Sequence, residues 1–265
     1  MACEEHGLER SATMNDPLSS ARQKLARAEK HFVDLQNEIS EFTQENPYEH
    51  VTEPQADKPG FTVEKVRMTK EIPPTIADLT ADIAISLRSA LDNAGYAIAV
   101  AAGTSNPKYC AFPFAGTAAQ LANALGRSKD IPDGIQSLFC GFQPYKGGND
   151  LLWALNEVAN TDKHRMVIPI GQALTRYGAS VSGTGFFSMP DPHVWDRAKN
   201  EMKLIELGPG ATYKYDFQFQ FFIAFHDIEF IDGKSVVKIL MQFGNIVQRL
   251  LLGMESECRR LKIFK

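Results

Sequence analysis

The residues best suited to chemistry gather in the short segment Asn156–Arg165. Asn160, Asp162, His164 and Arg165 follow one another there at spacings of one or two residues. A histidine beside a carboxylate can move protons near neutral pH, and an arginine can hold an anionic group. These residue types therefore allow either acid–base chemistry or the binding of a small polar or anionic ligand.

A second polar group lies on a separate predicted helix. Arg88, Asp92 and Tyr96 stand four residues apart, so they form one line that borders the apolar face of that helix. Glu157 lies on the helix that leads into the first segment, on a stripe beside the apolar one. The side chains that could bind a ligand at the two segments are Arg88, Tyr96, Glu157, Asn160 and Arg165.

The two polar groups are expected to meet inside the fold. Asp162 continues the apolar stripe of its own helix, so its carboxylate should point inward, where a charge needs a partner. We therefore expect Arg88 to pair with Asp162, and Asp92 to face His164 or Arg165. Such a network could simply fix the register of two helices, or it could form a site in which His164, Asp162 and Asp92 are the candidate catalytic residues.

The spacing of other residues argues against several kinds of site. Asp162 and His164 diverge by about 200° on a helix, which is too far for one metal ion, and no H-x-x-x-H pair occurs. The nucleophile motif G-x-S-x-G and the phosphate-binding loop G-x-x-x-x-G-K-[ST] are both missing. The sequence therefore predicts no metal site and no cofactor.

The composition predicts a cytoplasmic protein. Its 265 residues carry a net charge of −4, which argues against nucleic acid as a partner, and no apolar run reaches the length of a membrane-spanning helix. The four cysteines occur singly, as in a reducing compartment, and the first residues are polar and acidic rather than like a signal peptide.

Helical periodicity marks four main helices. Residues 16–46 carry a narrow apolar stripe on a helix that could be an arm or part of the domain, and residues 75–102 carry a wider one. A third helix is predicted from Asn149 or Asp150 to about Lys163, and a fourth over residues 235–261. The long helices would also allow a homo-oligomer to form through a coiled coil.

Strand patterns fill the remaining segments. Residues 48–70 read as two strands around a QADKPG turn, and residues 165–170 and 202–207 as one strand each. Aromatic residues on every second position from Tyr213 to Phe225 predict one further strand. We therefore expect an α+β fold in which long helices pack against a mainly antiparallel sheet, with a disordered segment 1–15 and a single domain over 47–265.

Three pieces of the sequence resemble a widespread group of uncharacterised bacterial proteins. They are LRSALD at 87–92, Phe112-Pro-Phe, and Gln143-Pro-Tyr145 followed by the Asn-x-Asp-Lys-His-Arg motif at 160–165. The resemblance covers about residues 75–170 and implies no particular activity. The long helices are also distantly similar to the HEPN helical class, some of whose members are RNases. The catalytic motif of that class is Arg, four to six residues, then His, whereas Arg27 and His31 are separated by only three residues.

The sequence thus favours a non-enzymatic binding or assembly protein with a polar site near Asn160–Arg165. The alternative is a hydrolase or nuclease that uses Asp92, Asn160, Asp162, His164 and Arg165, with His164 as the acid–base group.

Overall fold

A computed structural model describes residues 16–126, 131–161, 167–173, 182–189, 194–214 and 219–264. The segment 1–15, which we expected to be disordered, lies outside this part of the chain.

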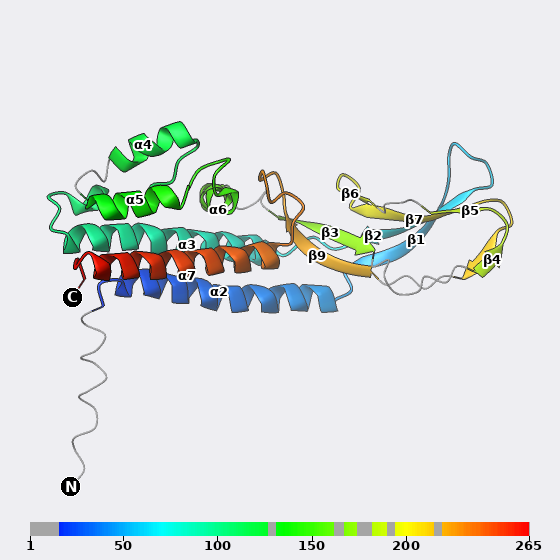
Figure 1. The fold of residues 1–265 in the computed structure, drawn as a ribbon. Helices are drawn as coiled ribbons and strands as arrows, with labels where there is room; N and C mark the ends of the chain where they lie inside the picture. Colours follow the sequence, from blue (N-terminus) through cyan, green and yellow to red (C-terminus); the bar gives the residue numbers. More distant parts are fainter. Residues whose placement is uncertain are drawn as a thin grey trace, which may run out of the picture.

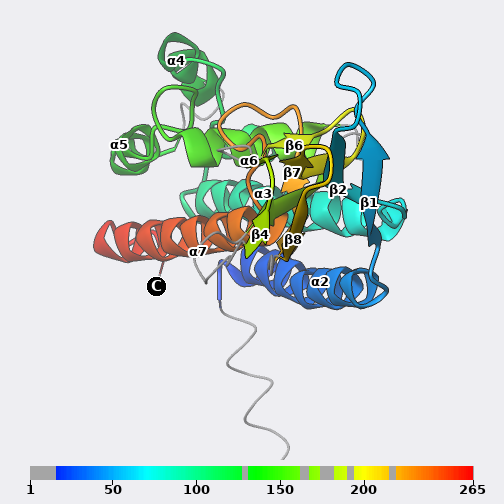
Figure 2. The same ribbon diagram turned by 90° about the vertical axis from the view of Figure 1, so that its right-hand side faces the viewer.

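Helices gather at one end of an elongated molecule and strands at the other (Figure 1). The three long helices α2, α3 and α7 lie side by side, the shorter α5 and α6 lie against one side of them, and α4 lies beyond α5 (Figures 1 and 2). The helices are α2 Ser19–Gln44, α3 Pro74–Ala101, the 3-10 helix η1 Pro107–Tyr109, α4 Ala118–Gly126, α5 Asp133–Gly141, α6 Asp150–Asn160 and α7 Val236–Arg260.

The described strands pair antiparallel in three small sheets. The largest has the order β1-β2-β7-β5, with β6 also paired to β7, while β3 pairs with β9 and β4 with β8. The strands are β1 Tyr48–Pro54, β2 Thr62–Met68, β3 Val167–Ala173, β4 Ser182–Thr184, β5 Phe187–Ser188, β6 Trp195–Asp196, β7 Glu201–Leu207, β8 Thr212–Lys214 and β9 Phe219–Phe225. The predicted α+β class with a mainly antiparallel sheet is confirmed.

The aromatic alternation from Tyr213 to Phe225 does not form one strand of one sheet. Its first part belongs to β8 and its last part to β9, and the two strands pair with different partners. Residues 215–218 between them lie outside the described chain. Alternation reports only that a segment is extended, so it could not reveal that the chain changes sheets within it.

Helix α3 is the centre of the helical half. Half of its 28 residues are buried, and seven of these are Ala or Gly. Such small side chains let α2, α6 and α7 approach the α3 backbone closely from different sides. The main core is built around this helix, and a smaller second cluster centred on Val66, Trp195 and Met202 lies within the sheet.

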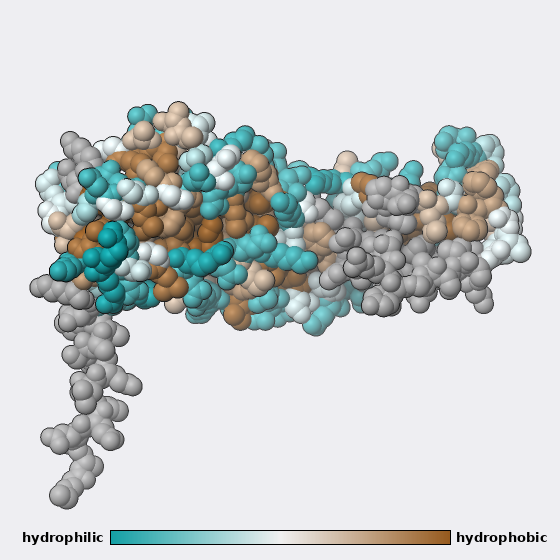
Figure 3. Space-filling view, in the orientation of Figure 1, coloured by the Kyte–Doolittle hydropathy of each residue, from teal (hydrophilic) through white to brown (hydrophobic). Residues whose placement is uncertain are grey.

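Helix α7 connects the two halves. Its cap Ser235 accepts from the Lys238 backbone N–H, and Ser235 also forms a bridge with Ala224 of β9. By length and composition α7 is apolar enough to cross a membrane, and its core-facing side chains, among them Val236, Phe243 and Leu251, are buried. Figure 3 shows apolar side chains gathered over the helical half of the molecule.

The chain after η1 lies directly against α3 at Gly95. A Cβ built on Gly95 would come within 2.7 Å of the Cys110 carbonyl oxygen and 3.2 Å of the Ala111 carbonyl carbon. Backbone atoms cannot move aside as a flexible side chain can. Only glycine therefore allows the segment Cys110–Phe114 to lie this close to the helix.

Replacing Gly95 with Ala should destabilise the protein, although the same change normally stabilises a helix by about 1 kcal/mol. The clash with backbone should outweigh that gain, with a net loss of about 1–3 kcal/mol. Gly244→Ala on α7 is the matched control, because a Cβ there meets no atom within 4 Å, and it should stabilise. Urea unfolding gives the free energy of unfolding of each variant. A change in the same direction for Gly95→Ala and Gly244→Ala would contradict this interpretation.

Candidate functional site

Helix α6 ends earlier than its sequence predicted. Asn149 caps its start by accepting from the Leu152 backbone N–H at 3.1 Å, as expected, but the last helical residue is Asn160 rather than one near Lys163. Thr161 already has an extended backbone, with φ −84° and ψ 149°. The inward direction of Asp162, which was inferred by continuing the helix, therefore loses its basis.

The two predicted polar groups meet where α3 passes the end of α6. Arg88 Nη1 on α3 donates to Asn160 Oδ1 at 3.2 Å. Asn160 Nδ2 in turn donates to the Asn156 carbonyl oxygen at 2.8 Å, which holds the amide with its oxygen toward the arginine. This contact joins residues that lie 72 positions apart in the sequence.

Arg88 is held on a second side by an aromatic ring. Its guanidinium carbon lies 5.9 Å from the centroid of Phe114, within the range of a cation–π interaction. Its Nε atom is buried and has no hydrogen-bond partner among the described residues. A buried N–H donor without an acceptor is costly, so this atom marks where an acceptor would be bound most favourably.

Asp92 lies one helical turn from Arg88 and holds the segment that supplies Phe114. Its Oδ1 accepts from the Phe112 backbone N–H at 3.2 Å. Burial raises the pKa of Asp92, while the Arg88 charge and the Phe112 hydrogen bond act in the opposite direction without cancelling the rise. Asp92 and Arg88 thus attract one another, while burial opposes ionisation of the carboxyl.

The other predicted site residues either make no contact with Arg88, Asp92 or Asn160, or lie outside the described part of the chain. Tyr96 is 49% exposed on the surface of α3. Glu157 is half-buried on α6, and the contact described for it is its backbone carbonyl, which accepts from the Thr161 hydroxyl at 2.7 Å. Asp162, His164 and Arg165 lie outside the described residues, so their pairing with Arg88 and Asp92 stays a prediction.

Sequence reasoning missed the aromatic side of the site. Phe112 packs edge-to-face on Phe114 and Phe139, with centroids 4.9 and 5.4 Å away. The apolar run from Tyr109 to Ala115 is typical of a segment that packs against the core. It could not indicate that Phe114 contacts an arginine, because that contact depends on how closely the segment approaches α3.

A second ionic cluster, which the sequence did not single out, ties three strands together. Lys65 Nζ on β2 lies 2.6 Å from Glu53 on β1 and 2.8 Å from Glu201 on β7, and Arg67 contacts both carboxylates. Lys65 and Glu201 are buried. The four residues lie on three strands, with Lys65 and Arg67 both on β2, so the strand register brings the two carboxylates to the two cations.

The cations of this cluster lower the pKa of both carboxyls. Hydrogen bonds from Lys65 and then Arg67 lower the pKa of Glu53 to about 2. Burial acts to raise the pKa of Glu201, but the bonds from Lys65 and Arg67 outweigh it and lower that pKa as well. The described residues hold no group of three or more His, Cys, Asp or Glu side chains that could bind a metal ion. We interpret the four-residue cluster as structural.

Glu201→Gln should lower the free energy of unfolding by about 3 kcal/mol at pH 7, because it leaves Lys65 buried beside a weaker partner. Since both carboxyls have lowered pKa values, the stabilisation is complete above the unfolded pKa of about 4 and is lost as pH falls toward 2. The gap between wild type and variant in urea titrations should therefore narrow in acid. A constant gap from pH 7 to pH 3 would count against the charge-based account.

Asp92→Asn should leave the free energy of unfolding at pH 7 nearly unchanged or raise it. The amide oxygen can still accept from the Phe112 N–H, while the buried charge is removed. A raised pKa in the folded state means that the carboxyl destabilises the fold when ionised and ceases to do so as pH falls through that pKa. The difference in free energy of unfolding between Asp92→Asn and wild type should therefore shrink as the pH is lowered from 7 to 4. Asp92→Ala, which removes the acceptor, should destabilise by about 1–2 kcal/mol at both pH values.

No family model, curated protein or solved structure matches this chain. The geometry around Arg88 is therefore the basis for a functional proposal.

Proposed function

We propose that this chain is a non-enzymatic cytoplasmic binding protein that holds a small anionic ligand, such as a carboxylate or phosphate group, against Arg88. The observation that carries the proposal is the Arg88 side chain, whose guanidinium is fixed by Asn160 and Phe114 while its buried Nε donor has no partner among the described residues.

Preorganisation supports binding at this position. An arginine presents its donors in a rigid planar fork that matches the two oxygens of a carboxylate or phosphate. Arg88 already lies between an amide oxygen and a ring, so a ligand would not have to order a flexible side chain. Neither the Asn160 amide nor the Phe114 ring carries a formal charge, so neither would repel an anion.

Among the described residues of the cluster, the neighbouring carboxyl of Asp92 is the group that opposes an anion. Asp92 carries a raised pKa, because burial disfavours its ionised form. Its Oδ1 is directed to the Phe112 N–H. The hydrogen bond thus turns this oxygen toward the Phe112 backbone.

The proposal is tested by the melting temperature of wild type and Arg88→Gln in inorganic phosphate and in acetate, each at millimolar concentrations. A ligand that binds only the folded state raises the melting temperature. At least one anion should stabilise the wild type, and Arg88→Gln should lose most of that response. An equal response in both proteins, or no response in the wild type, would refute the proposal.

Arg197→Gln is the matched control for this experiment. Arg197 forms a bidentate ion pair with Asp232 at 3.1 Å on the sheet half, with no role in the proposed site. The Arg197→Gln variant loses the same positive charge, and its melting temperature should respond to anions as that of the wild type does. Native mass spectrometry of the purified wild type and Arg88→Gln would also identify any bound small molecule that depends on the arginine.

One observation favours the alternative function, a hydrolase or nuclease. A carboxyl with a raised pKa beside an arginine, as at Asp92 and Arg88, is an arrangement suited to general acid–base catalysis. Hydrolysis of bis(p-nitrophenyl) phosphate by the wild type, lost in both Asp92→Asn and His164→Ala, would support the enzyme instead of the binding protein.

A further inference from the structure

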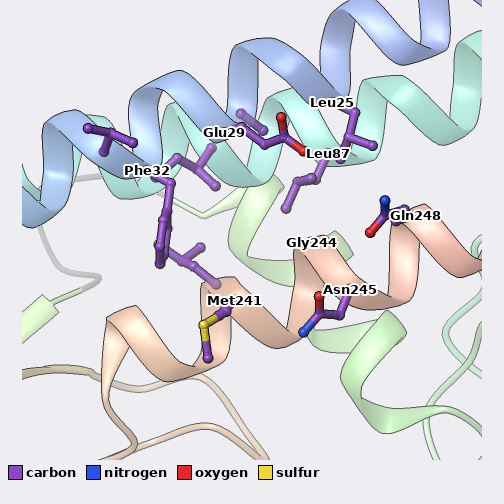
Figure 4. A pocket seen from close by; sticks show the side chains of 12 residues that line it. Leu25, Glu29, Phe32, Leu87, Met241, Gly244, Asn245 and Gln248 are labelled. Carbon is purple, nitrogen blue, oxygen red and sulfur yellow. The ribbon is translucent and has the colours of Figure 1, made fainter.

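An open groove lies between α2 and α7, with α3 as its floor (Figure 4). Its volume is about 290 Å³. Leu25 and Phe32 project into it from α2, and Leu87 projects into it from α3. Gly244 faces it from α7, where a Cβ would meet no atom within 4 Å. The absence of a side chain at Gly244 therefore helps to keep the groove open.

The surface of the groove is mostly apolar and reaches solvent. Val33 on α2 is 55% exposed and Met241 on α7 is 54% exposed, and both belong to the lining. Small-molecule sites are hollows of roughly 300–1,000 Å³ with mostly apolar walls and a few polar groups, and this groove comes close to the lower end of that range. Its size thus suits a small molecule better than a helix or strand of another protein.

Three polar side chains stand at the edges of the apolar surface. Glu29 belongs to α2, and Asn245 and Gln248 belong to α7, so they lie on opposite sides of the floor (Figure 4). The two amides are neutral and can accept hydrogen bonds through their oxygens. Among the described residues that line the groove, Glu29 is the one with a charge.

The described neighbours of Glu29 do not neutralise this charge. Its carboxylate forms no ion pair within the described part of the chain. Residues three and four positions away share its face of the helix, and none of them is charged: Leu25, Ala26, Phe32 and Val33. Any cation that approaches Glu29 from solvent therefore meets an unpaired carboxylate.

The arginine at the end of the groove is already paired. Arg22 lies one turn before Leu25 and contacts Asp16 at 2.8 Å and Glu255 of α7 at 2.6 Å. It thus joins the two helices beyond the Leu25 end of the groove, with its charge matched by two carboxylates. A hollow with one uncompensated carboxylate at its edge attracts a cation and repels an anion.

We propose that the groove binds an amphiphilic amine, a small molecule with an alkyl or aryl body and one ammonium group. The body would lie on Leu25, Phe32 and Leu87, and the ammonium would donate to the Glu29 carboxylate. This ligand has the opposite charge to the anion proposed at Arg88, and the inference does not depend on that site.

Isothermal titration calorimetry of the full chain with n-octylamine and 1-octanol tests the proposal. The two probes share one chain length and differ in the charge of the head group, and both are used below the concentration at which micelles form. The wild type should bind octylamine about fivefold more tightly than octanol, the gain expected of a partly exposed ion pair.

Glu29→Gln tests the charged edge of the groove. This variant should bind octylamine no more tightly than octanol, while its affinity for octanol should equal that of the wild type. Glu41→Gln is the matched control, because it removes the same charge from α2 outside the groove lining, and it should keep the wild-type preference.

Gly244→Leu tests the apolar part without altering charge. The added side chain fills the groove and should weaken binding of both probes by about tenfold or more. Gly141→Leu at the end of α5 is the matched control, since a Cβ there also meets no atom within 4 Å, and it should bind both probes as the wild type does. Circular dichroism compares the helical content of all variants.

A photoreactive probe decides the location if Gly244→Leu loses helical content. Octylamine that carries an alkyl diazirine should crosslink to residues 25–33 of α2 or 240–248 of α7 in the wild type. The proposal fails if the crosslinks fall elsewhere, or if the wild type binds the two probes equally or binds neither. It also fails if Glu29→Gln keeps the preference or a folded Gly244→Leu keeps both affinities.

Sedimentation velocity tests the competing occupant, a second copy of the chain. The wild type should keep the same mass with and without octylamine. A wild-type dimer that octylamine dissociates would place a second copy in the groove and overturn the proposal.

Discussion

The close approach of four chain segments to the backbone of α3 is the constraint on which the rest of the helical half depends. Alanine and glycine occupy the contact positions of this helix, so α2, α6, α7 and the segment after η1 can all pack against it. At Gly95 the approach is so close that any side chain would meet the Cys110 carbonyl. Larger residues there would push the neighbours outward and open the core.

The candidate site is a consequence of that packing. Arg88 lies on α3 where α6 ends, and Asp92 lies one turn further along, where the Phe112–Phe114 segment is bound. The distance between Arg88 and Phe114 is thus set by how near the segment lies to α3. A polar cluster on a surface loop would lack this support, whereas here each side chain is attached to an element that the core already holds.

The groove between α2 and α7 depends on α3 in a different way. Because α3 lies beneath both helices, α2 and α7 leave a channel above Leu87 instead of closing over it. The Arg88 cluster and the groove thus share one central helix, with Leu87 facing the groove and its neighbour Arg88 contacting α6.

The sequence by itself determined the elements whose signal is local. The apolar periodicity of α2, α3 and α7, the Asn149 cap and the turn between β1 and β2 were all predicted, since each depends on residues within a few positions of one another. Arg88 does contact Asn160 of the predicted polar segment, but through a solvent-exposed hydrogen bond, and its expected pairing with Asp162 inside the fold stays a prediction.

Only the tertiary structure decided the features that join distant residues. It ended α6 at Asn160, divided the aromatic run between β8 and β9, gave Arg88 the Phe114 ring, and assembled Lys65 and Glu201 from separate strands. Periodicity fixes which face of an element is apolar, but it carries no information about which other element covers that face. That choice depends on backbone approach distances and strand register, which exist only once the chain is folded.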